Sequence, residues 1–184
     1  MKYISKMTQT FTEGALLLFL VLTLGQAGHA EVCTVDRLTD AGEGEGPRGD
    51  LRYCITSARS GEDTITFEVT GTINLTRALL ELTASVTIEG PGAENLTVRR
   101  DTGGDYRIFT VGPSTTVVLS GLTTADGQTE QGGGIYVAGG RLTLIASILS
   151  NNRAVGRPGG LLEHGGPGLV GALEVQKAYY DKLK

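Results

Sequence analysis

Three short apolar runs recur in the same order at a nearly constant spacing, and this recurrence limits the fold more than any other feature of the sequence. RIFTV (107–111) aligns with GIYVA (134–138) at a shift of 27 residues. TVVLSG aligns with RLTLIAS at a shift of 25, and LTT with ILS at a shift of 26. A unit of three short strands cannot bury its own apolar face, so we expect the units to stack into a coil whose strands pair in parallel.

An earlier and looser copy of the unit consists of GTINL, SVTIEG and LTVRR. Aligning all three copies predicts three inward stacks of apolar side chains: Ile73, Ile108 and Ile135; Val86, Val117 and Leu142; Leu96, Leu122 and Ile148. The fold class predicted is all-β, a right-handed parallel β-helix of few coils. The alternative is an antiparallel sandwich, which also has short strands at regular spacing. It is disfavoured because no two-residue Asn-Gly or Asp-Gly hairpin joins neighbouring strands convincingly.

The first thirty residues have the pattern of an export signal. Lys2 and Lys6 give a basic start, and an apolar stretch of about ten residues (15–24) follows, which is short for a bilayer span. Small residues at Gly28 and Ala30 favour cleavage after Ala30. The alternative is an uncleaved anchor. We therefore expect a secreted or cell-surface protein, in a bacterial outer membrane or extracellular setting, that meets a membrane only through its export signal.

The chain contains two cysteines, Cys33 and Cys54. Export places them in an oxidising compartment, where a bridge would close a loop of about 20 residues and contribute about 3 kcal/mol in the chain-entropy model. The alternative is two free buried thiols. Two cysteines alone do not make a metal site, so no metal and no cofactor are expected.

Residues 31–63 are expected to form an N-terminal cap region, followed by coils over 64–155. A helix is predicted from Asp50, a good N-cap residue, with Leu51 and Cys54 on one face and Gly61 able to end it. This helix is placed at the N-terminal end of the coil, where it would cover exposed strand edges. Formal net charge is −4, which argues against a nucleic-acid partner.

Three segments carry a family resemblance: DAGEGEGPRGDLRYCI (40–55), EDTITFEVTGTINL and SVTIEGPGAENLTV. They resemble the N-terminal part of exported bacterial right-handed parallel β-helix proteins of the pectin-lyase-like kind. GGGIYVAGGRLTLIASILSNN is similar to the repeats of polymorphic outer-membrane proteins. The resemblance implies the β-helix fold and says little about activity. The chain departs from it in an apparent insertion at 43–46, in showing two to three coils, and in the atypical tail 156–184.

The resemblance includes polysaccharide lyases and hydrolases, which use clustered charged residues. The candidates for such chemistry here are Arg99, Arg100, Asp101 and Asp105, which fall at a turn where charged residues are common in any case. No catalytic residue is assigned. Arg48-Gly49-Asp50 spells a tripeptide used in integrin binding when a loop displays it, although Asp50 has the simpler role of helix N-cap.

The sequence leaves three functions open. The favoured one is a structural or adhesin-like module that binds a carbohydrate or a host or cell-surface protein. The second is a carbohydrate-active β-helix enzyme fragment, and the third is a truncated, inactive product. The tail is either a helical cap with Leu169, Leu173 and Tyr180 on one side or a truncation product, and its His164 is expected to be inert. Open coil edges favour self-association.

Overall fold

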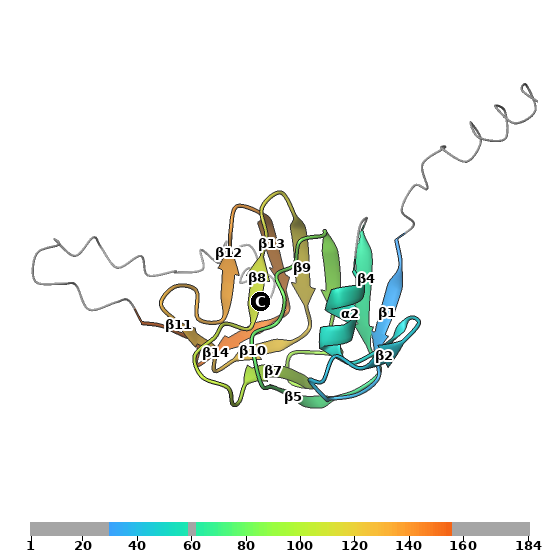
Figure 1. Ribbon diagram of the computed structural model, residues 1–184, viewed down its shortest axis with the longest axis horizontal. Helices are drawn as coiled ribbons and strands as arrows, with labels where there is room; N and C mark the ends of the chain where they lie inside the picture. Colours follow the sequence, from blue (N-terminus) through green and yellow to red (C-terminus); the bar gives the residue numbers. More distant parts are fainter. Residues whose placement is uncertain (1–29, 59–61, 156–184) are drawn as a thin grey trace, which may run out of the picture.

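The computed structural model describes residues 30–58 and 62–155 and shows a parallel β-solenoid of about four turns (Figure 1). Its largest sheet has the strand order β13-β9-β6-β4-β1-β3-β2. The strands of this first sheet are β1 (Val32–Val35), β2 (Gly44–Glu45), β3 (Arg48–Gly49), β4 (Asp63–Phe67), β6 (Val86–Glu89), β9 (Thr116–Ser120) and β13 (Arg141–Ile145). In the described part of the chain, β2 and β3 are the one antiparallel pair.

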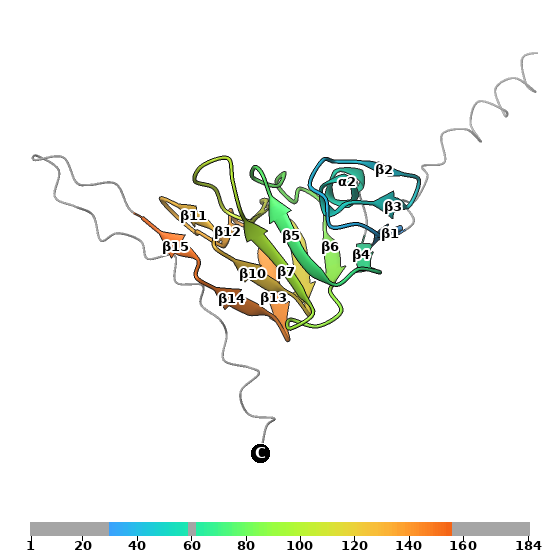
Figure 2. The ribbon, with the colours of Figure 1, turned by 90° about the horizontal axis from the view of Figure 1, so that it is seen from below.

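Two further sides complete each turn. The second sheet has the order β14-β10-β7-β5, formed by β5 (Gly71–Leu75), β7 (Leu96–Arg100), β10 (Thr123–Ala125) and β14 (Ile148–Ser150). The third side pairs β8 (Phe109–Val111) with β12 (Ile135–Val137), and a small corner sheet pairs β11 (Gln128–Thr129) with β15 (Arg153–Ala154). Strands of one turn lie on different sides and pair with the turns before and after, as Figure 2 shows for β5, β7, β10 and β14. The parallel coil is therefore confirmed.

The inward stack on the first sheet is the one predicted. Val117 lies opposite Val86 on one side and Leu142 on the other. Strand residues alternate between the two faces of a sheet, so the next inward row is Ile65, Ile88, Leu119 and Leu144. Ile65, Ile88 and Leu119 are fully buried, as is Val117.

The stack predicted from Leu96, Leu122 and Ile148 is wrong at its last member. Ile148 pairs with Thr123, and half of its surface is exposed (50%). The turns that lead from the first sheet to the second have the same length after β9 and after β13, so the shift between these coils stays at 25 residues. Ser147 therefore takes the place equivalent to Leu122. A slip of one residue turns a side chain to the opposite face of a strand.

The stack predicted from Ile73, Ile108 and Ile135 is also wrong. Ile73 lies in the second sheet opposite Val98, whereas Ile135 lies on the third side opposite Phe109. GTINL is thus the counterpart of LTVRR, and β4 supplies the first side of that turn. The irregular segment after β5 forms the third side, where Leu82 bridges to Val111. This additional turn explains why the structure has about four turns where the sequence suggested two to three.

The predicted helix is α2 (Leu51–Ser57), which lies at the β1 end of the solenoid (Figure 1). Asp50 is its N-cap, as predicted, and accepts a hydrogen bond from the Tyr53 amide at 2.8 Å. Its inner face adds Leu51, Cys54 and Ile55 to the core formed by the strands. The chain leaves the helix at Ala58, before Gly61.

Several predictions concern residues outside those that the structure describes. These are the export signal up to residue 29 and the tail with Leu169, Leu173, Tyr180 and His164. In residues 30–58 and 62–155, no helix has the length and apolar character needed to cross a membrane.

Candidate functional site

A buried polar network joins the N-terminal loop, the helix and the turn after β5. Arg52 donates from Nε to Asp40 Oδ1 at 2.9 Å, and its Nη2 lies 2.7 Å from the same oxygen. Nη1 donates to the backbone carbonyl of Ala78 at 2.7 Å, and Nη2 also donates to that of Arg77 at 2.9 Å. Asp40 Oδ2 accepts from both the amide and the hydroxyl of Thr76. Because these donors and acceptors satisfy one another inside the protein, the network holds structure rather than a ligand.

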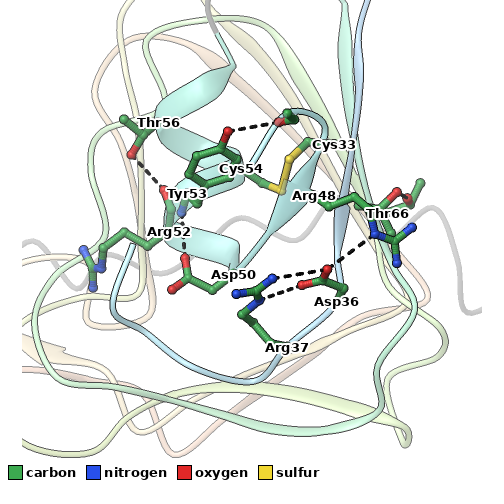
Figure 3. The surroundings of a disulfide bond; sticks show 12 residues. Cys33, Asp36, Arg37, Arg48, Asp50, Arg52, Tyr53, Cys54, Thr56 and Thr66 are labelled. Carbon is green, nitrogen blue, oxygen red and sulfur yellow. Dashed lines mark hydrogen bonds and ion pairs between the residues drawn. A yellow bond between two sulfur atoms is a disulfide. The ribbon is translucent and has the colours of Figure 1, made fainter. Parts of the chain in front are cut away.

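Asp50 is fully buried and acts as the centre of the Gly-rich loop (Figure 3). One carboxylate oxygen accepts from the amides of Gly42 at 2.7 Å and Glu43 at 3.1 Å, and the other accepts from the Tyr53 amide. The Arg-Gly-Asp tripeptide is therefore not displayed for integrin binding. Its aspartate, the group that a receptor would need, faces inward.

Arg48, the first residue of that tripeptide, is held on the surface by two carboxylates. It donates from Nη1 to Glu68 at 3.2 Å and from Nε to Asp36 at 3.4 Å. The hydrogen bond from Arg48 lowers the pKa of Glu68, and the hydrogen bond from Arg37 lowers the pKa of Asp36. These exposed pairs tie β1, β3 and the end of β4 together on one side of the sheet.

The apparent insertion at 43–46 forms the hairpin of β2 and β3, which packs under the ring of Tyr53. A Cβ atom at Gly44 would lie 2.3 Å from the ring, and one at Gly49 would lie 2.6 Å from it. The Tyr53 hydroxyl donates to the Gly46 carbonyl at 3.0 Å. Glycine is needed at Gly44 and Gly49 because the ring lies directly against the backbone there.

The predicted disulfide between Cys33 and Cys54 is present and links β1 to α2 (Figure 3). The two Cα atoms are 5.6 Å apart. Beside the bridge lies a groove of about 430 Å³. Its lining is Glu31, Val32, Cys33, Gly46, Pro47, Cys54, Ser57, Ala58, Asp63, Thr64 and Ile65. One of its two carboxylates, Asp63, accepts a hydrogen bond from the Glu31 amide at 2.9 Å, so it is partly used within the fold.

The structure brings the charged candidates at 99–105 together, and their arginines bind other parts of the coil. Arg99 donates to the Asn74 side chain at 2.6 Å and to Asp101 at 3.2 Å. Arg100 donates to the backbone carbonyl of Asp126 at 2.7 Å, in the next coil, and its Nη1 lies 3.8 Å from Asp105. Both guanidinium groups therefore connect adjacent turns of the solenoid. In the described ranges, no three His, Cys, Asp or Glu side chains are placed to hold a metal ion.

The outward face of the first sheet carries two regular columns of side chains, which we call the threonine face. The register of strand pairing aligns the residues of the first column, which are Val32, Thr64, Thr87, Val118 and Thr143. The second column is Arg48, Thr34, Thr66, Glu89, Ser120 and Ile145. Arg48 and Glu89 are its charged members, and Arg48 is paired there with Glu68 and Asp36. The Thr34 and Thr66 hydroxyl oxygens are 3.4 Å apart. From β4 to β13 the face is thus mainly an array of hydroxyl and methyl groups spaced by the strands, and its charged groups are Glu89 and, at the β3 end, Arg48 with its carboxylate partners.

Sequence reasoning missed the pairing of Arg52 with Asp40 and the cation–π contact of Arg107 with the Tyr136 ring, whose centroid is 4.5 Å away. A signal existed for the first pair, since both residues lie in the segment that carries the family resemblance. Nothing in the local sequence points to the second pair, because Arg107 and Tyr136 lie on different turns.

Comparison of the chain with protein-family models, with curated proteins and with solved structures found no match. The fold defines the class: a disulfide-linked protein of the parallel β-solenoid type whose described residues, 30–58 and 62–155, include one short helix, next to β1.

Proposed function

We propose that this protein is an exported β-solenoid module with a structural or adhesin-like role, and that it binds its partner through the threonine face. The support is the regularity of that face, where the pairing register repeats the two columns over five strands, β1, β4, β6, β9 and β13. Adjacent strands lie about 4.8 Å apart, so the face offers the same groups at a short fixed period. A carbohydrate polymer or a repetitive cell-surface protein fits a surface of this kind.

The disulfide supports export, because such bridges persist in oxidising compartments and are rare in the cytosol. The export signal at residues 1–30, the secreted or cell-surface location and an attachment to the membrane through that signal alone belong to this proposal. The test is fractionation of the producing cell followed by N-terminal sequencing of the exported product. A mature chain that begins at Glu31 supports the proposal, and a cytosolic full-length chain contradicts it.

Binding is tested by co-sedimentation of the purified protein with insoluble polysaccharides and with intact cells. The double variant Thr64→Lys/Thr87→Lys places two charges in the first column and is expected to abolish sedimentation. The matched control is Thr72→Lys/Thr97→Lys, a pair of neighbouring threonines on the second sheet. Equal loss in both variants, or binding that survives the first, would rule out the threonine face as the binding surface.

The alternative function is that of a carbohydrate-active enzyme, and the charged group Arg99, Arg100, Asp101 and Asp105 favours it. An assay for unsaturated or reducing-end products released from pectin and related polymers decides between the two. We expect no product. Product release that is lost in Arg100→Ala, in a variant that retains its fold, would replace the binding proposal with the enzymatic one.

A further inference from the structure

The last turn of the solenoid exposes apolar side chains whose counterparts one turn earlier are buried. Leu142 and Leu144 in β13 are only partly buried, whereas their partners Val117 and Leu119 are fully buried. In β14, Leu149 is 37% exposed, although its partner Thr124 is nearly inaccessible. The core is therefore open at this end.

The strand edges at the same end are open as well. Within the described residues, β12, β13, β14 and β15 are each the outermost strand of their sheet. An edge of this kind presents unpaired N–H and C=O groups that other strands can join. The opposite end differs, because α2 adds its apolar face to the core there and the disulfide attaches it to β1.

We propose that residues 156–184 of the same chain cover this open end. The segment begins directly after Val155, whose amide donates to Thr129 at the corner of the last turn. Its 29 residues (184 − 155) could span close to 100 Å if fully extended, far more than the end of a small solenoid requires. Its apolar residues are Leu161, Leu162, Leu169, Val170, Leu173, Val175, Tyr179, Tyr180 and Leu183. Leu169, Leu173 and Tyr180 have the spacing of one helix face and would contact the exposed leucines of β13 and β14.

A covalently attached segment has an advantage over a second copy of the chain. A short tether gives it an effective concentration in the millimolar range, and it avoids most of the loss of translational and rotational freedom that a dimer incurs. When the segment covers this end, the open strand edges can no longer pair with a second copy of the chain. The protein is then a monomer in which the last turn is as well protected as the turn before it.

The test is hydrogen exchange on the full chain, comparing peptides from β13 and β14 with peptides from β4 and β6. In the unmodified protein we expect slow, concentration-independent exchange in β13 and β14. In Leu169→Asp/Leu173→Asp we expect exchange in these two strands to rise by about tenfold or more, while β4 and β6 change little. The control Val175→Asp places one aspartate on the opposite side of the predicted helix and should leave exchange unchanged.

Three results would overturn the proposal. The first is exchange in β13 and β14 of the unmodified chain that is already as fast as in the double variant. The second is protection that appears only as protein concentration rises, which assigns the end to a second copy. The third is an equal effect of Val175→Asp, or an equal rise in β4 and β6, because either shows a general loss of stability.

Discussion

Arg52 and Asp40 form an ion pair inside the protein, with Nη2 and Oδ1 2.7 Å apart and both side chains almost inaccessible to solvent. The pair connects three segments: the helix, the loop before it and, through the Thr76 amide and hydroxyl, the turn that follows β5. The arginine and the aspartate of the segment that resembles exported β-helix proteins thus have a structural explanation. They join the N-terminal region to the first full turn.

Removing one partner of this pair should destabilise the protein strongly. Arg52→Met leaves the Asp40 carboxylate buried without its cation, and we expect a loss of about 3–5 kcal/mol in the free energy of unfolding. Urea unfolding followed by circular dichroism measures it. Arg37→Met is the control, because Arg37 pairs with Asp36 at the exposed surface and its loss should change the free energy of unfolding little. Equal losses in the two variants would contradict the structural role given to Arg52.

The disulfide should contribute measurably to stability, because it closes a loop with a sequence separation of 21 residues. Cys33→Ser/Cys54→Ser is expected to lower the free energy of unfolding by about 3 kcal/mol in the chain-entropy model. The unmodified protein should take up no thiol reagent when denatured, and two equivalents per chain after reduction. Labelling without reduction would show that the protein does not carry the bridge.

Tyr106 should make stability fall at alkaline pH. Its hydroxyl oxygen lies 2.5 Å from the carbonyl of Leu75 and 2.7 Å from that of Thr102, which share its one proton, and burial raises its pKa. The folded state therefore retains the proton at a pH where the unfolded chain releases it. The stabilisation is complete below the ordinary tyrosine pKa of about 10 and is lost as the pH rises through the higher folded value.

Tyr106→Phe tests this prediction. It should lower the free energy of unfolding at neutral pH by about 1–2 kcal/mol, because the donor that the two carbonyls share is removed. It should also reduce the decline in stability above pH 10 in a series of urea titrations. Tyr53→Phe removes a hydroxyl that donates at the surface and should have a smaller effect. If the free energy of unfolding of Tyr106→Phe still declines equally above pH 10, other groups cause the decline.

Gly90 and Gly121 lie against each other on adjacent turns, where neither position has space for a side chain. A Cβ atom at Gly90 would lie 2.2 Å from the Gly121 carbonyl oxygen, and one at Gly121 would lie 2.5 Å from that of Gly90. Gly90→Ala should destabilise the fold by several kcal/mol or prevent folding, as judged by thermal unfolding. Gly46 has a positive φ but open space around it, so Gly46→Ala should lower the free energy of unfolding by about 1 kcal/mol. Similar losses of stability in the two variants would indicate that backbone conformation, and not steric contact of the added Cβ atom, limits these positions.

Local signals were sufficient for part of the fold. Asp50 is recognisable as an N-cap from the sequence, because a short polar residue before a helical apolar pattern has a defined partner three residues on, the amide of Tyr53. The stack of Val86, Val117 and Leu142 followed from matching runs at a constant shift. The position of Ile73 could not be inferred in this way, because an irregular segment replaces the third strand of its turn and its own run resembles strands of more than one side.

The sequence by itself determined that the strands pair in parallel between successive turns, since runs repeated about 25 residues apart can bury their apolar faces only by stacking. It also determined the helix start and the cysteine pair available for a bridge. Tertiary structure alone decided the register of Ile148, the burial of Asp50 within its tripeptide and the pairing of Arg52 with Asp40. Each of these depends on turn lengths and on contacts between segments far apart in the chain, which local pattern does not contain.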